Sequence, residues 1–235
     1  MLLAVDKLNL FIGRTHILRD ISIYVEKGEI ICLLGRNGAG KSSLIKSVIG
    51  LYPSNSGKIF FNDREITASR PKERVLAGIG YSPDDARVFT ELTVEENIQL
   101  STWVTGKIRE HNIFTLDKIL DIFPAVKKFF HRKGMHLSGG EKKMVSIARA
   151  LALNPSLLLL DEAFEGLAPV VVNHFMEALR QVRELGITIL VGESNVRLSS
   201  LFADRAYIIE RGEIVFEGPP GRILEDEKLI KLVGK

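Results

Sequence analysis

The residues best suited to chemistry form a glycine-rich loop at positions 35–42, with the sequence Gly-Arg-Asn-Gly-Ala-Gly-Lys-Ser. A strand-like apolar run, residues 30–34, precedes the loop, and a helix-like stretch, residues 43–50, follows it. Glycines allow backbone N–H groups to turn towards an anion where a Cβ would collide or where φ must be positive. The succession of strand, loop and helix predicts a binding site for the phosphates of a nucleotide. We call residues 35–42 the phosphate loop.

Each part of the phosphate loop has an expected contact with a nucleoside triphosphate. The Lys41 ammonium brings a positive charge to the β- and γ-phosphates, and the Ser42 hydroxyl is a hard oxygen ligand suited to Mg²⁺. The helix that follows directs its unpaired N–H groups and its positive dipole end at the same phosphates. The residues predicted to bind the nucleotide here are Gly35, Arg36, Asn37, Gly38, Ala39, Gly40, Lys41, Ser42 and Ser43.

Two acidic residues, Asp161 and Glu162, end a second apolar run at residues 157–162. Such a run suits a strand buried on both faces of a parallel sheet, where ligands bind at the carboxyl ends of the strands. If this strand neighbours the one before the phosphate loop, Asp161 can hold Mg²⁺ through its water shell and Glu162 can deprotonate the water that attacks the γ-phosphate. A lone Asp-Glu pair could simply end a strand in solvent, so the catalytic interpretation depends on the phosphate loop.

A further candidate is the segment Leu-Ser-Gly-Gly-Glu at residues 137–141, directly before a helical run at residues 142–151. Ser138 is a natural N-cap, and Gly139 and Gly140 let the backbone approach a charged group closely. The segment could therefore be a second anion site at a helix N-terminus. By spacing alone, an ordinary helix start fits equally well.

The composition fits a globular protein of one large or two small domains, with 235 residues of which 46% are hydrophobic. The 32 basic residues nearly balance the 29 acidic ones, which gives no indication of a nucleic-acid partner. The single cysteine, Cys32, lies in an apolar run, so we expect a core residue in a reducing compartment. No apolar stretch is long enough to span a bilayer, and we expect a soluble, cytoplasmic chain.

The spacing of apolar residues predicts an α/β fold with a helical middle section. Short strands are expected at residues 2–5, 21–25, 30–34 and 58–61, several of them in an antiparallel sheet. Amphipathic helices are expected at residues 116–123 and 126–130, separated by Pro124. An α/β pattern completes the chain, with a helix at 171–185, a strand at 187–191, a helix near 195–202 and a hairpin at 206–215 that turns at Arg211 and Gly212.

The three motifs, in this order, resemble those of the ATP-binding-cassette (ABC) ATPases, and the resemblance covers essentially the whole chain. It implies an α/β ABC ATPase fold, with a P-loop (RecA-like) parallel-sheet core, an antiparallel β subdomain and a helical subdomain. In a single domain of residues 1–235, the core and the β subdomain would comprise residues 1–86 and 152–235, and the helical subdomain residues 87–151. We call residues 137–141 the signature segment, after its counterpart in that family.

The resemblance also implies a composite site between two cassettes packed head to tail, with ATP and Mg²⁺ as cofactors. Ser138, Gly139, Gly140 and Glu141 of one cassette would cover the γ-phosphate of an ATP bound by the other, which would be a second copy or a related cassette. The helical subdomain would face transmembrane permease subunits on the inner face of the cell membrane. A substrate-binding protein would be an indirect partner, and no nucleic acid is expected.

A finer resemblance links the chain to the ATP-binding subunits of branched-chain amino-acid importers, of the LivF type. The segments that carry it are residues 81–84, 87–89, 92–97, 166–169 and 215–219. The cassettes of lipopolysaccharide exporters share much of this layout and are the alternative within the family.

Several positions depart from the family pattern. Asp84 stands where a Gln, or a Glu in the LivF type, senses the γ-phosphate and Mg²⁺, so an oxygen ligand remains. Ser194 replaces the longer His or Gln that contacts the γ-phosphate and the attacking water, and Ala163 replaces the Pro after the acidic pair. Ile12 stands in place of the aromatic residue that stacks on adenine, although Phe11 could serve after a shift of one residue.

The departure at Ser194 weakens one hydrogen-bond donor to the γ-phosphate, whereas the general base, Glu162, is kept. Losing a transition-state donor typically lowers the rate about 10²–10³-fold, whereas losing a general base lowers it about 10²–10⁴-fold. Because Lys41, Ser42, Asp161 and Glu162 are retained, we expect a slow but genuine ATPase. The open alternative is a subunit that closes on ATP without hydrolysing it. Cassettes that act on ribosomes or DNA usually carry a second cassette or a long coiled coil, and a metabolic kinase has no reason to carry residues 137–141.

Overall fold

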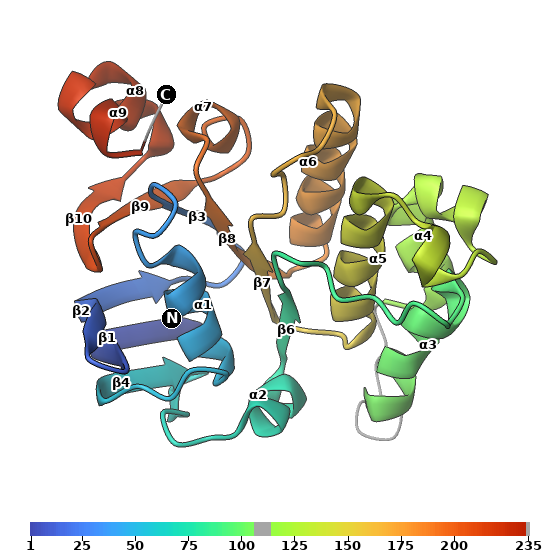
Figure 1. The fold of residues 1–235 in the computed structure, drawn as a ribbon, viewed down its shortest axis with the longest axis horizontal. Helices are drawn as coiled ribbons and strands as arrows, with labels where there is room; N and C mark the ends of the chain where they lie inside the picture. The colour runs from blue at the N-terminus through green and yellow to red at the C-terminus, as the bar shows by residue number, and fades with distance from the viewer. Residues whose placement is uncertain (106–113, 234–235) are drawn as a thin grey trace.

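The computed structural model describes residues 1–105 and 114–233 and has the expected α/β fold, built on two sheets (Figure 1). The larger sheet has the order β10-β9-β3-β8-β7-β6 and the smaller one the order β2-β1-β4-β5. The strands of the larger sheet are β3 (Ile30–Leu34), β6 (Ile79–Ser82), β7 (Leu157–Asp161), β8 (Thr188–Glu193), β9 (Arg205–Glu210) and β10 (Glu213–Gly218). Those of the smaller sheet are β1 (Leu3–Ile12), β2 (Thr15–Val25), β4 (Ser56–Phe61) and β5 (Arg64–Glu65).

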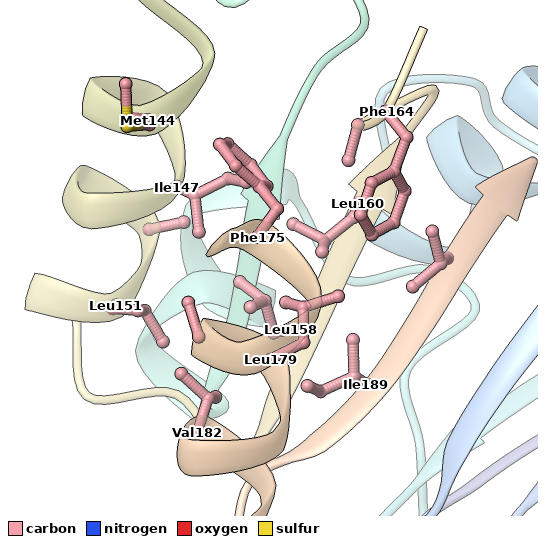
Figure 2. Close-up of a cluster of buried hydrophobic side chains, with 14 of the residues drawn as sticks. Met144, Ile147, Leu151, Leu158, Leu160, Phe164, Phe175, Leu179, Val182 and Ile189 are labelled. Atoms are coloured by element: carbon pink, nitrogen blue, oxygen red, sulfur yellow. The ribbon is translucent and has the colours of Figure 1, made fainter. Parts of the chain in front are cut away.

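The central strands of the larger sheet run parallel and are buried on both faces. Their alternate side chains therefore enter two different cores. Leu158 and Leu160 of β7 pack with α5 (Gly139–Ala152) and α6 (Pro169–Glu184), as Figure 2 shows. The other face packs with α1 (Lys41–Ile49) and the smaller sheet. Cys32 lies in the first core as predicted, where burial raises the pKa of its thiol to about 12.

The antiparallel sheet is longer than the sequence predicts, because two residues of its main hairpin adopt left-handed backbone conformations. Lys7 and Asp20 both have φ of 46°, and the pairing of β1 with β2 shifts register beside them. Such bulges break the alternation of apolar and polar residues by which a strand is recognised. The predicted strand 21–25 is therefore only part of β2, and the predicted strand 2–5 covers only the start of β1, which begins at Leu3.

The middle of the chain is helical, with α3 (Val94–Thr105), α4 (Leu116–Ile122), the 3₁₀ helices η1 (Pro124–Phe129) and η2 (Gly134–His136), and α5. The predicted second helix at residues 126–130 is wrong in type and start, since a 3₁₀ helix begins at Pro124. Proline fits the first position of a helix because its missing N–H is not needed there. Pro124 thus separates two helices as predicted.

The hairpin of β9 and β10 forms one edge of the larger sheet. It turns at Arg211 and Gly212, with φ of 48° and 84°, the left-handed pair that tight hairpins require. Helix α2 (Pro71–Ala77) is not predicted from the sequence. Three short helices, α7 (Val196–Ser199), α8 (Pro220–Glu225) and α9 (Glu227–Val233), lie in the last part of the chain. Within the described ranges, no helix has the length and apolar character needed to cross a membrane.

Candidate nucleotide site

The phosphate loop leaves β3 at the carboxyl end of the sheet and turns directly into α1. Gly38 and Gly40 have φ of 82° and 119°, which glycine adopts without strain. At Gly35, a Cβ would lie 2.5 Å from the carbonyl oxygen of Ile209. The helix begins two residues earlier than predicted, so Ser42 and Ser43 lie in its first turn. Arg36, Asn37 and Gly38 are exposed, and together with Ala39 they border a hollow of about 330 Å³.

Lys41 lies inside the phosphate loop with only 3% of its surface exposed. Its ammonium donates hydrogen bonds to the carbonyl oxygens of Gly35 at 2.8 Å and Arg36 at 3.3 Å. It also lies 3.8 Å from Oε1 of Glu162. The charge is thus held at the centre of the loop, where the phosphates of a nucleotide would meet it.

Asp161 reaches the phosphate loop across an intervening strand. The sequence predicts this contact if β3 and β7 are neighbours, but β8 lies between them. Ser42 Oγ nevertheless donates to Asp161 Oδ1 at 2.9 Å. The residue of β8 that pairs with Asp161 is Gly192, where a Cβ would lie 3.3 Å from Asp161 Oδ1 and 2.9 Å from Ile45 Cδ1. The missing side chain at Gly192 leaves this space open to the Asp161 carboxylate.

The Asp161 carboxylate has the properties of a ligand for a hard cation. It is 1% exposed, and among the described residues its Oδ2 is buried without a hydrogen-bond partner. Burial raises the pKa of Asp161, and the hydrogen bond from Ser42 offsets part of this increase. Asp84 is exposed, and its carboxylate pairs with Lys46 of α1 at 3.8 Å while its charge also acts on Asp161. One buried carboxylate and one hydroxyl beside a phosphate site fit Mg²⁺, which takes few protein ligands together with phosphate oxygens.

Glu162 follows β7 in a left-handed conformation, with φ of 50°. Its N–H donates to the carbonyl oxygen of Gly192 at 3.0 Å. The pKa of its carboxyl is raised to about 7, chiefly by a hydrogen bond with Glu165, then by burial and by the charges of Glu165 and Asp161, while Lys41 lowers it. A carboxyl that titrates near neutrality and lies beside Lys41 suits a general base.

The signature segment forms the start of α5, and Ser138 is its N-cap as predicted. Ser138 Oγ accepts from the N–H of Glu141 at 3.3 Å, and Glu141 Oε2 accepts from the N–H of Ser138 at 2.8 Å. Arg132 pairs with Glu141 as well. The Gly139 position is open, because a Cβ added there would meet no described heavy atom within 4 Å. The hydrogen bonds and ion pairs of the described residues join the phosphate loop to Asp161 and Glu162 but not to the signature segment.

The other predicted site residues lie at exposed ends of strands. Ser194 directly follows β8, and its N–H donates to Glu193 Oε2 at 3.2 Å. Phe11 and Ile12 end β1 and are 43% and 48% exposed. The Phe11 ring stacks on His16, with the two ring centres 4.1 Å apart.

Two further charged residues, Glu193 and Lys143, lie at the site and are not predicted from the sequence. Glu193 is 3% exposed at the end of β8, and its Oε1 accepts from the N–H of Phe164 at 3.1 Å. Burial raises its pKa, and hydrogen bonds from the backbone of Phe164 and Ser194 lower it. The sequence signal for it is an acidic residue two positions beyond the predicted strand 187–191. Lys143 donates to carbonyl oxygens of residues 162 and 165, a contact between distant segments that carries no local signal.

Comparisons with known proteins identify the family of the chain. A profile of the ABC transporter family matches residues 18–165. The branched-chain amino-acid transport ATP-binding protein BraG of Pseudomonas aeruginosa is 36% identical, covering 97% of both chains. The probable LivF of Archaeoglobus fulgidus is 38% identical over 98% of both. The lipopolysaccharide export ATP-binding protein LptB of Escherichia coli is 35% identical over 90% of this chain and 88% of its own.

Solved structures give the same result. The crystal structure of the ADP conformation of MJ1267, an ATP-binding cassette of an ABC transporter, superposes with a TM-score of 0.83 at 27% identity, covering 100% of this chain and 99% of MJ1267. The fold is therefore the one expected from the sequence resemblance. The chain belongs to the ABC transporter family, as one of its ATP-binding and ATP-hydrolysing subunits.

Proposed function

We propose that this chain hydrolyses Mg²⁺-bound ATP to drive a membrane transporter for branched-chain amino acids, most simply an importer. The observation that carries the ATPase part is the convergence of Lys41, Ser42, Asp161 and Glu162 at the ends of β3 and β7. BraG and LivF, which match the chain over nearly their full lengths, support the substrate class. LptB is almost as similar, so a lipopolysaccharide exporter is the second candidate.

In this proposal each residue of the site has a separate role towards one bound nucleotide. The backbone of the phosphate loop and Lys41 bind the phosphates, and the Glu162 carboxylate takes the proton of the attacking water. Ser42 and Asp161 hold Mg²⁺, with Asp84 close enough to act on Asp161 by its charge. When bound, the metal neutralises charge on the phosphate oxygens. Ser194 is a short donor near the same edge, which makes turnover slow.

Two chains supply the complete site. The signature segment makes no described contact with the phosphate loop of its own chain, and Ser138 and Gly139 are exposed. A head-to-tail pair would bring each signature segment onto the nucleotide held by the partner. The second cassette is a copy of this chain or a related subunit.

Exposed apolar and aromatic side chains offer contacts for the permease subunits and for the adenine ring. Phe89, Trp103 and Met135 of the helical section are 50%, 70% and 46% exposed, and such apolar side chains suit contacts with transmembrane permease subunits. Binding there would hold the chain against the inner face of the membrane, and a substrate-binding protein would act through the permease. The stacked Phe11 and His16 offer a flat face for adenine.

Reconstitution in proteoliposomes tests this proposal. The chain is co-purified with transmembrane permease subunits, reconstituted, and supplied with ATP and the substrate-binding protein. We expect ATP-dependent uptake of leucine that is lost with Glu162→Gln. ATP-driven extraction of lipopolysaccharide without leucine uptake would favour the second candidate, and failure to co-purify with any membrane subunit would contradict both.

The alternative mechanism is a subunit that closes on ATP without hydrolysing it, and the short side chain of Ser194 is the observation that favours it. Such a subunit would bind ATP and pair with its partner without turning ATP over. Turnover of the purified chain separates the two, since a non-hydrolysing subunit leaves ATP intact.

A further inference from the structure

Lys143 joins α5 to the loop that carries Glu162. Its ammonium donates to the carbonyl oxygens of Glu162 and Glu165, each at 2.6 Å. These are charge-assisted bonds, which are shorter and stronger than neutral ones. We call residues 162–165 the base loop. Lys143 is half-buried, and the charges of Glu193, Glu165 and Glu162 act on it.

The base loop needs such support because Glu162 has a left-handed backbone. A non-glycine residue keeps φ of 50° only where its surroundings hold it there. From β8, Gly192 accepts the N–H of Glu162 at 3.0 Å and Glu193 accepts the N–H of Phe164 at 3.1 Å. From α5, Lys143 binds the two carbonyl oxygens. The loop is thus fixed from two elements on different sides.

Helix α5 supports Lys143, because it is packed into the core. Met144, Ile147 and Leu151 share one face of the helix and pack against α6 and β7, as Figure 2 shows. The first turn of the same helix is the signature segment, whose last residue, Glu141, is two positions before Lys143. The signature segment and Lys143 are therefore carried by the same packed helix.

We propose that Lys143 is a positioning residue for ATP hydrolysis, which holds the base loop so that Glu162 faces the nucleotide at Lys41. It thereby links the signature segment, which meets the partner's nucleotide, to the base that acts on the chain's own nucleotide. This inference rests on the proposed role of Glu162 as general base. Lys143 is not a catalytic residue, because it contacts the base only through the backbone.

Substitution of Lys143 separates positioning from simple stability. Lys143→Met keeps the aliphatic stem and removes the donors. We expect kcat to fall about 10–100-fold, because a displacement of about 1 Å costs up to about 10²-fold. KM for ATP and the affinity for a fluorescent ATP analogue stay within about twofold, since Lys143 does not touch the phosphate loop. Lys143→Arg, which keeps charge and donors, recovers most of kcat.

Lys142→Met is the matched control. It removes the same charge one residue away, and among the described residues the Lys142 ammonium has no hydrogen bond or ion pair. We expect its kcat to stay within about twofold of the wild type. If Lys143→Met does not fold, Lys143→Gln, which keeps a shorter donor, should fold and lie between Lys143→Met and wild type in its effect on kcat.

The decisive measurement is a double-mutant cycle with Glu162→Gln. If Lys143 acts through Glu162, adding Lys143→Met to Glu162→Gln lowers kcat no further. If the fold-losses in kcat of the two single variants multiply in the double variant, or if Lys143→Met has a wild-type kcat, the inference is overturned and the role of Glu162 stays intact. A wild-type kcat for Glu162→Gln alone would instead overturn the proposed role of the base itself.

Discussion

The hydroxyl of Ser42 donates to Oδ1 of Asp161 at 2.9 Å, although β8 separates the strands that lead to the two residues. Gly192 of β8 is the position between them, and it carries no side chain. The contact joins the first turn of α1 to the end of β7 and places a hydroxyl and a buried carboxylate side by side. This pair is the structural basis of the Mg²⁺ site that we propose.

Removing the Asp161 charge should weaken Mg²⁺ binding. With Asp161→Asn, we expect the Mg²⁺ concentration that gives half-maximal ATP turnover to rise at least about tenfold, since a charged ligand is replaced by a neutral one. A Mg²⁺ titration of ATP turnover measures the effect. Asp85→Asn is the control, because Asp85 is exposed and pairs with Arg87. An unchanged requirement in Asp161→Asn would exclude Asp161 as a metal ligand.

Mixing two inactive variants tests the composite site. Lys41→Ala removes the phosphate contact, and Gly140→Asp places a negative charge where the partner's γ-phosphate would lie. In a mixed head-to-tail dimer, one site carries both defects and the other carries none. An equal mixture should therefore recover up to about a quarter of wild-type turnover. No recovery, despite exchange of subunits, would mean that each chain holds a complete site.

Lengthening the side chain at position 194 should speed hydrolysis. Ser194→His adds a donor that can reach further from the end of β8, and we expect turnover to rise about tenfold or more, since one transition-state donor is worth about 10²–10³-fold. Steady-state turnover at saturating ATP measures it. Ser200→His, directly after the nearby helix α7, controls for the added imidazole. Equal rates for Ser194→His and wild type would say that position 194 does not face the phosphate.

The thiol of Cys32 should be inert in the folded chain. It is fully buried in β3, and burial raises its pKa to about 12, so at pH 8 both the thiolate fraction and access are negligible. A colorimetric thiol reagent should give no signal in buffer and one thiol per chain in denaturant. Rapid labelling in buffer would contradict the buried position of β3.

The parts of the structure that local patterns determine were predictable. The buried strand β3 matches its predicted limits because five consecutive apolar residues suit a strand covered on both faces. The turn at Arg211 and Gly212 and the N-cap at Ser138 follow from residue types with strong conformational preferences.

The parts that depend on distant segments were not predictable from one sequence. The left-handed conformations of Lys7, Asp20 and Glu162 are imposed by tertiary contacts and leave no local pattern. The strand order that puts β8 between β3 and β7 is likewise a property of the whole sheet. For the same reason Lys143, which is linked to the base loop 19 and 22 residues away, is found only in the structure.

The most direct test compares Mg²⁺-dependent ATP turnover of the purified chain with that of Glu162→Gln, with ATP affinity measured on both. Our account predicts that the wild-type chain hydrolyses ATP and that Glu162→Gln loses about 10²–10⁴-fold in turnover while binding ATP with similar affinity. Equal turnover of the two proteins would contradict it.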